Sequence, residues 1–247
     1  MRALWLLPLL LPLLLLGCRE PAPLETIAST DMSIDALLAC GPGIPVAHRG
    51  TSDGWPEPEN SLAALERLIR EQVPVAEIDV AQSSDGTHFL YHDSDWEDDS
   101  TCEGDVAASR WDKASQCQLE RDGQVSGERP PLLEDVFSTA TGRIALEIDF
   151  KRSADYETVI RLVRAARMSD SVILITYSNA QARKLSRLAP DMWVSVPENY
   201  PEFDPRRHLR WTDRDAPWER GPSIAFHPAA DFTVSDRAAE MDWECGT

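Results

Sequence analysis

The feature that most restricts the fold of this chain is an alternation of short apolar segments with segments of helical periodicity, beginning at residue 45. The apolar segments predict strands over 45–47, 75–80, 87–91, 144–150, 172–177 and 193–196. The periodic segments predict helices over 62–69, 132–137, 156–163 and 179–189. Such alternation is typical of a parallel sheet with helical crossovers, and its extent suits a TIM-type (β/α) barrel or a doubly wound sheet.

Two parts of the chain fit this alternation poorly. Residues 93–130 are acidic and weakly patterned, and they predict a long loop with one short helix at most. After Pro197 the pattern fades, and the sequence offers at most two weak strands, one of them over 223–226. The sequence therefore leaves open a barrel that is incomplete or that closes irregularly. An open barrel would expose the edges of its strands.

The N-terminus has the features of a targeting segment. Residues 1–17 contain one basic residue and a Leu-rich run, as in a secretory signal peptide. The sequence from Leu15 to Cys18 resembles a bacterial lipoprotein box, in which the cysteine is lipidated and becomes the new N-terminus. An ordinary signal peptide with a chance cysteine is one alternative, and a transmembrane anchor is another, which Pro8 and Pro12 disfavour.

This segment predicts where the protein resides and how it is organised. Lipidated Cys18 would attach it to a membrane of the bacterial cell envelope, facing the periplasm or the exterior. Residues 18–43 would be the lipidated cysteine and a tether, and 44–247 the folded domain. Disulfides are permitted there, and Cys102 and Cys117 flank a polar stretch that suits a local bridge. A bridge between Cys40 and Cys245 would join the two ends of the domain, and the sequence leaves it open.

Composition excludes several classes of protein. The 247 residues are 43% hydrophobic and 27% charged, unlike a disordered chain. The formal net charge of −18 would repel a phosphate backbone, so we expect no nucleic-acid partner. No protein partner is indicated.

Acidic residues interrupt two of the predicted strands. Glu77 and Asp79 lie two residues apart and so point to one face of the strand, and Glu147, Asp149 and Lys151 do the same in another strand. Carboxylates on a buried face repel each other and are costly to desolvate, and a hard divalent cation relieves both costs. The alternative is a pair of exposed faces with solvated acids.

Histidines follow two of the apolar strands. His48 precedes Arg49, and His92 precedes Asp93. A pair of histidines can serve as base and acid on opposite sides of a reacting centre, and an arginine suits phosphate oxygens. The other three histidines are expected to be structural: His88, His208 and His227.

Six short motifs, in this order and spacing, resemble the glycerophosphodiester phosphodiesterase family: His48-Arg49-Gly50, Pro58-Glu59-Asn60-Ser61, Glu77-x-Asp79, Asp85-Gly86, His92-Asp93 and Asp149-x-Lys151. The resemblance covers roughly residues 44–196. It implies a TIM-type barrel, one divalent cation, calcium or magnesium, and hydrolysis of a small or lipid-derived glycerophosphodiester to an alcohol and glycerol 3-phosphate.

The resemblance also implies roles for individual residues. Glu77, Asp79 and Asp149 would bind the metal. His48 and His92 would be the acid–base pair. Arg49 and Lys151 would hold the phosphate, with Glu59 in support. The family has glutamate where this chain has Asp149, so Glu147, one pleat earlier on the same face, is the alternative third ligand.

Two other functions remain open. A related barrel phosphodiesterase of the phospholipase D type, acting on intact or lyso phospholipids, resembles this chain around the histidines and the Asp-x-Lys motif. A catalytically degenerate surface-binding lipoprotein would suit the weak C-terminal third, but the retained His48, His92, Arg49 and Lys151 argue against it.

Overall fold

The computed structural model describes residues 31–212, 221–227 and 229–245. Its sheet strands are β1 (Ile44–Ala47), β2 (Val75–Gln82), β3 (His88–Leu90), β6 (Ala145–Phe150), β7 (Val172–Ile175), β8 (Trp193–Val196), β9 (His208–Trp211), β10 (Ser223–Ala225) and β11 (Phe232–Ser235). Its helices are α1 (Ile34–Ala39), η1 (His48–Gly50), α2 (Leu62–Arg70), α3 (Trp111–Ala114), α4 (Leu133–Ala140), α5 (Tyr156–Ala165), α6 (Asn179–Leu188) and η2 (Ala238–Glu240). A separate hairpin pairs β4 (Glu120–Arg121) with β5 (Gln124–Val125).

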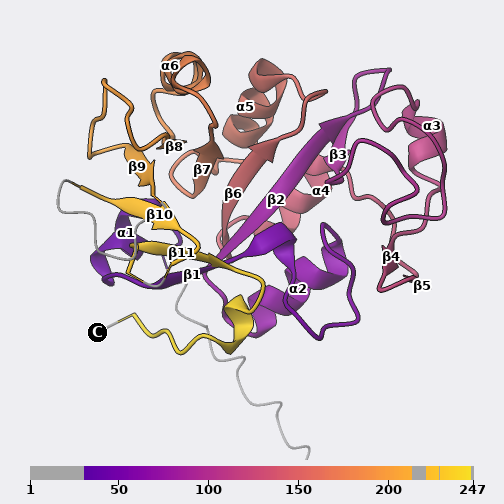
Figure 1. Ribbon diagram of the computed structural model, residues 1–247, viewed down its shortest axis with the longest axis horizontal. Helices are drawn as coiled ribbons and strands as arrows, with labels where there is room; N and C mark the ends of the chain where they lie inside the picture. Colours follow the sequence, from indigo (N-terminus) through magenta and orange to yellow (C-terminus); the bar gives the residue numbers. More distant parts are fainter. Residues whose placement is uncertain (1–30, 213–220, 228, 246–247) are drawn as a thin grey trace, which may run out of the picture.

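The strands form a closed barrel of eight parallel strands (Figure 1). β1 closes it by pairing on one side with β2, where Val46 is opposite Val75, and on the other with β11, where Ile44 is opposite Phe232. The short β3 extends the sheet as an antiparallel neighbour of β2. The alternation left open a barrel or a doubly wound sheet, and the TIM-type barrel that the family resemblance implied is confirmed; the barrel is complete.

The expectation of at most two weak strands after Pro197 is wrong, because β9, β10 and β11 all lie there. These strands have three or four residues each and carry buried polar side chains, which hide the apolar pattern. The polar groups have partners across the fold: His208 Nε2 lies 3.0 Å from the Ser186 hydroxyl, and Thr233 donates to the carbonyl of His227.

Alternate positions of each strand face two different cores. On β2, Ala76, Ile78 and Val80 face outward into an apolar layer shared with the helices α2, α4, α5 and α6. Val75 faces inward, into a second apolar cluster that fills the barrel and includes residues of β7, β8 and β11. Glu77 and Asp79 follow Val75 at inward positions because side chains alternate along a strand.

α1 closes the amino-terminal end of the barrel. Ser33 caps this helix by accepting a hydrogen bond from the backbone N–H of Ala36, and Ile34 and Leu37 are fully buried in the inner cluster. The folded domain therefore begins before residue 44, its predicted start, because Ile34 and Leu37 already pack into the inner cluster. A six-residue helix gave too few turns for its apolar face to be recognised in the sequence.

Residues 93–130 form an insertion with its own small core. Phe89, Tyr91, Trp96, Val106 and Leu119 pack together there. α3 and the β4–β5 hairpin lie in this segment, and the hairpin was not predicted. Cys102 is bonded to Cys117 within the insertion, and Cys40 is bonded to Cys245 across the ends of the domain.

The bridge within the insertion leads to a first prediction. Replacing Cys102 and Cys117 together by serine is expected to lower the free energy of unfolding by up to about 3 kcal/mol, because the bridge closes a loop of 15 residues in the unfolded chain. Equilibrium urea unfolding measures this change. An unchanged midpoint and slope would show that the bridge does not stabilise the fold.

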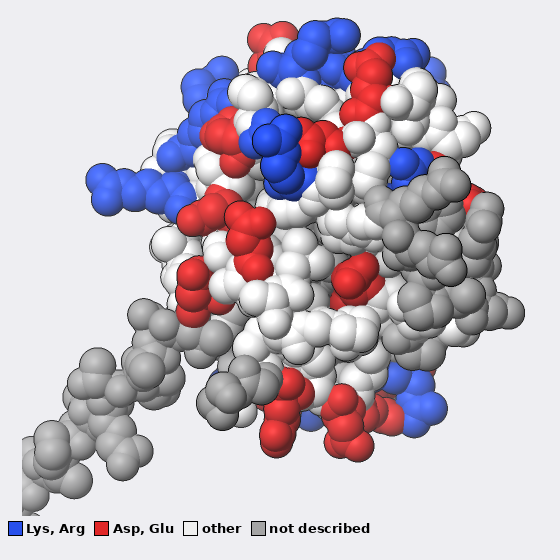
Figure 2. Space-filling model, turned by 90° about the vertical axis from the view of Figure 1, so that its left-hand side faces the viewer, with Lys and Arg blue, Asp and Glu red and all other residues white. Residues whose placement is uncertain are grey.

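Residues 1–30, with the predicted signal peptide and the lipidated Cys18, lie outside the described residues. Among the residues that are described, no helix has the length and apolar character needed to cross a bilayer. Figure 2 shows the side of the molecule on which α6, β9 and α1 lie, where basic side chains gather along the upper edge and acidic ones are spread below.

Candidate active site

A cavity of about 320 Å³ opens at the carboxyl ends of the barrel strands. One side of it is polar and is lined by His48, Glu77, Asp79, His92, Asp149 and Lys151. The opposite side is mainly apolar and is lined by Ile175, Tyr177, Pro197, Trp211, Phe226 and Val234. This end of a parallel barrel is where active sites of the fold are built, because loops from all strands converge there.

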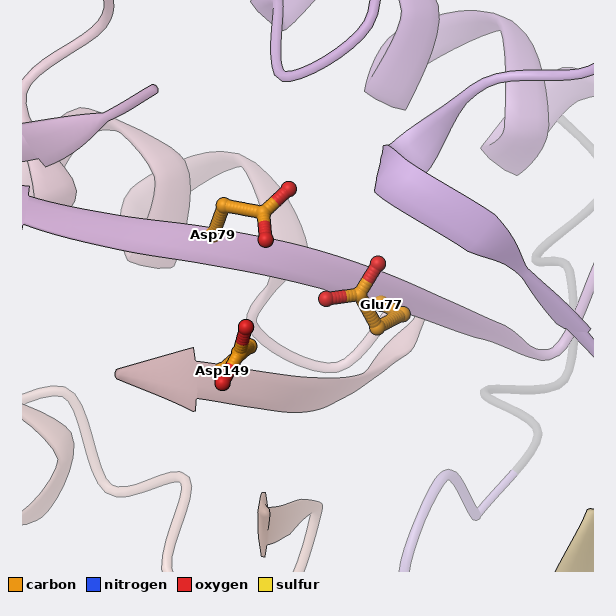
Figure 3. Close-up of side chains that lie close together, drawn as sticks. All are labelled: Glu77, Asp79 and Asp149. Atoms are coloured by element: carbon orange, nitrogen blue, oxygen red, sulfur yellow. The ribbon is translucent and has the colours of Figure 1, made fainter. Parts of the chain in front are cut away.

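The acidic residues meet because β2 and β6 are adjacent and in register. Glu77 lies opposite Glu147, and Asp79 lies opposite Asp149. Carboxylate oxygens of Glu77, Asp79 and Asp149 lie within 4.8 Å of one another, and all three side chains are buried (Figure 3). The carboxylates that lie two residues apart on each strand thus share a buried face, as predicted, and the register of the two strands brings them into one cluster.

Asp79 is the most completely hydrogen-bonded carboxylate of this cluster. Its Oδ1 lies 2.6 Å from the ammonium group of Lys151, and its Oδ2 accepts a 2.7 Å hydrogen bond from the Asn60 side-chain amide. Lys151 also lies 2.7 Å from Asp149 Oδ2. Burial lowers the pKa of Lys151, but the charges of Asp79 and Asp149 outweigh burial and raise that pKa overall, so Lys151 stays positively charged.

Other oxygens of the cluster have no donor. Asp149 Oδ1 and both carboxylate oxygens of Glu147 are buried, and no described residue donates a hydrogen bond to them. Burial, and secondly the neighbouring Asp149, raise the pKa of Glu147 to about 8, and burial raises that of Glu77 well above its usual value. Buried oxygen ligands without donors fit a hard divalent cation, which removes the penalty of holding several carboxylates together.

The two histidines of the cavity are each held by an aspartate. His48 Nδ1 lies 2.7 Å from Asp236 Oδ1, and His92 Nδ1 lies 2.7 Å from Asp93 Oδ1. A carboxylate at Nδ1 fixes the ring and leaves Nε2 as the nitrogen available for proton transfer. Both rings line the same cavity as the acidic cluster, which is the geometry that an acid–base pair requires.

Arg49 and Glu59 do not line this cavity. Arg49 has a left-handed backbone conformation with φ 52°, and its Nη1 lies 3.0 and 3.1 Å from the two oxygens of Glu59. The pair lines an adjoining groove, which also includes His48 and Asp236. The backbone N–H of Arg49 nevertheless donates a 2.6 Å hydrogen bond to Glu77, so the His-Arg-Gly turn positions a predicted metal ligand.

Sequence reasoning missed three features of the site. Asn60 binds Asp79 through both its side-chain groups, one residue before Ser61, which caps α2 by accepting from the N–H of Ala64. Its place in the Pro-Glu-Asn motif was the available signal. Asp236 follows the short β11, and nothing in the sequence marked it as a partner of His48. The cavity is also lined by Tyr177, Trp211 and Phe226, which lie in separate parts of the chain, so no local pattern groups them.

The model of the glycerophosphoryl diester phosphodiesterase family matches residues 48–233. The uncharacterized protein YqiK of Bacillus subtilis is 31% identical over 158 residues, covering 61% of this chain and 64% of its own length. A glycerophosphodiester phosphodiesterase of Caldanaerobacter subterraneus is 23% identical over 159 residues, covering 61% of this chain and 65% of its own length. The chain thus spans just under two thirds of the length of these curated relatives.

Solved structures show the same fold. A glycerophosphoryl diester phosphodiesterase from Parabacteroides distasonis superposes with a TM-score of 0.71 at 18% identity, over 84% of this chain and 90% of that one. A phosphodiesterase from Oleispira antarctica, solved in complex with the product sn-glycerol-3-phosphate, has a TM-score of 0.61 at 16% identity, over 81% of this chain and 95% of that one. From the match over residues 48–233 we conclude that the chain belongs to the glycerophosphoryl diester phosphodiesterase family.

Proposed function

We propose that this protein hydrolyses glycerophosphodiesters to an alcohol and glycerol 3-phosphate, with the help of one divalent cation. The observation that carries the proposal is the meeting, in one cavity, of a buried acidic cluster with unpartnered oxygens and two aspartate-held histidines. A cavity of about 320 Å³ is of the size that holds a small ligand. The product complex of the Oleispira relative supports the same class of substrate.

Glu77, Asp79 and Asp149 are the residues that would hold the cation, calcium or magnesium. Such an ion stabilises the negative charge that grows on the phosphoryl oxygens during attack. Lys151 lies within the polar wall and carries a second positive charge for the phosphate. Arg49 supports the site from the adjoining groove, where it also fixes the turn that carries His48.

His48 and His92 are the groups that move protons. One ring accepts the proton of the attacking hydroxyl, and the other donates a proton to the alcohol oxygen as its bond to phosphorus breaks. Attack by water would give glycerol 3-phosphate directly, whereas attack by the substrate's own glycerol would give a cyclic phosphate that water then opens. Asp236 and Asp93 hold the rings and stabilise each imidazolium when it forms. The family model matches residues 48–233, a range that contains both histidines.

The proposal predicts that the full chain releases glycerol 3-phosphate from glycerophosphocholine when calcium or magnesium is present, and that a chelator stops the release. An enzyme-coupled assay for glycerol 3-phosphate measures both. Restoring the cation should restore the rate, which separates metal removal from denaturation. Release at an undiminished rate in chelator would contradict the role of the cation, and a folded chain inactive on several head groups would contradict the reaction.

One observation favours a second candidate, a phospholipase D-type reaction on lyso phospholipids. Tyr177 and Phe226, at the apolar side of the cavity, are 71% and 58% exposed, so large apolar surface faces solvent beside the site. An acyl chain would cover such surface on binding. Choline release from lysophosphatidylcholine at a higher kcat/KM than from glycerophosphocholine would favour this candidate, and the reverse order would reject it.

A further inference from the structure

Glu147 has a different environment from every other carboxylate of the cavity. Its side chain faces inward from β6, is 1% exposed, and receives no hydrogen bond at either oxygen from the described residues. In contrast, Glu77 accepts from the backbone of Arg49, Asp79 accepts from Lys151 and Asn60, and Asp149 lies against Lys151. A carboxylate buried without a donor is costly unless a ligand or a proton neutralises it.

Its position suits a ligand of the same cation that the neighbouring acids would hold. Glu147 lies opposite Glu77 in the β2–β6 register and two residues before Asp149, on the same face of the strand. Both oxygens of Asp79 are already engaged by Lys151 and Asn60, whereas Glu147 offers two free oxygens and Asp149 offers one. The buried carboxylate oxygens without a hydrogen-bond donor therefore lie on β6, on Asp149 and, one pleat deeper in the barrel, on Glu147.

The side-chain lengths suit a ligand set that reaches deeper into the barrel. Glu147 is one methylene longer than Asp149, lies one pleat earlier on the same face of β6 and lines the same cavity. We propose that Glu147 is a further ligand of the divalent cation in this protein, in addition to Glu77, Asp79 and Asp149. This inference rests on the proposed function only in that it assumes a cation in this cavity.

Cation binding without substrate tests the proposal. Calorimetric titration of the full chain with calcium, and separately with magnesium, gives the dissociation constant for the unmodified protein, for Glu147→Gln and for Asp149→Asn. Glu147→Gln removes the charge and keeps the shape. We expect it to weaken binding by at least about 10-fold, because loss of even an outer-shell partner costs about 10–100-fold. Glu157→Gln, an equivalent change at an exposed position of α5, is the matched control and should leave binding unchanged.

A second readout reports ligation itself. Terbium replaces calcium at oxygen sites, and its luminescence lifetimes in H2O and D2O count the water molecules bound to the ion. Loss of a carboxylate ligand in Glu147→Gln should add about one bound water or more. Unchanged affinity together with an unchanged water count would overturn the proposal and leave Glu147 as a protonated bystander.

Two further comparisons keep the result clear. Glu147→Asp retains the carboxylate but withdraws it, so its affinity should fall between those of the unmodified chain and Glu147→Gln; unmodified affinity in Glu147→Asp would also count against ligation. Circular dichroism with chelator shows whether each variant is folded. Because binding is measured without substrate, the inference and the proposed reaction can fail separately. If Glu147→Gln lowers the affinity for the cation and the unmodified chain releases no glycerol 3-phosphate, the inference is supported and only the proposed reaction is rejected.

Discussion

Replacing His48 or His92 by glutamine is expected to lower kcat for glycerol 3-phosphate release by about 10²–10⁴-fold, with a smaller effect on KM. Each ring lines the cavity beside the acidic cluster, and each is held through Nδ1 by an aspartate. Glutamine keeps a polar side chain of similar reach but cannot exchange a proton near neutral pH. Steady-state kinetics with saturating cation measures the loss.

His88 provides the matched control. It lies on β3, is 3% exposed, accepts a hydrogen bond from the backbone of Asp155, and does not line the cavity. His88→Gln should therefore leave kcat close to that of the unmodified chain. If His48→Gln or His92→Gln retained kcat while folded, the corresponding ring would have no part in proton transfer.

Replacing Lys151 by methionine should have the largest effect on stability. The Lys151 ammonium lies 2.6 Å from Asp79 and 2.7 Å from Asp149, and both carboxylates are buried. Removing one partner of a buried ionic network leaves the remaining charges uncompensated, so the free energy of unfolding measured in chelator should fall by about 3–5 kcal/mol. Adding calcium should recover part of this loss, because the cation supplies the missing positive charge.

Lys184→Met is the comparison for this experiment. Lys184 is exposed on α6, where its ammonium lies 4.7 Å from the ring centre of Tyr156, so its replacement should change stability little. Urea unfolding of both variants, with chelator and with calcium, gives the four values needed. A Lys151→Met protein as stable in chelator as the unmodified chain would show that the carboxylates are neutralised by protons instead.

Much of the site could be predicted because its residues follow strong local patterns. Glu77, Asp79 and Asp149 interrupt apolar strands with a period of two, and this places them on one face without knowledge of the fold. His48 comes directly after β1, at the end where a barrel builds its active site, and His92 follows β3, the antiparallel neighbour of β2. The alternation of strands and helices between residues 45 and 196 predicted a parallel sheet with helical crossovers, and the family resemblance favoured a barrel over a doubly wound sheet.

The remaining features depend on contacts between distant parts of the chain. Asp236 reaches His48 across 188 residues, and no local pattern marks such a partner. β9 to β11 were too short and too polar to be recognised, since their polar side chains are satisfied by partners that only the closed barrel provides. The contact between Asn60 and Asp79 could not be predicted either, because it depends on the left-handed backbone of Asn60 and on a strand 19 residues away.

The bridge between Cys40 and Cys245 also changes how the barrel can form. Closing the ring requires Ile44 to meet Phe232, which are almost as far apart in sequence as the domain allows. Measured through the disulfide, the path between these two residues shortens to roughly 17 residues, and the entropy lost in closing a loop grows with the logarithm of its length. An oxidised chain that has unfolded therefore begins refolding with its last strand already close to its first.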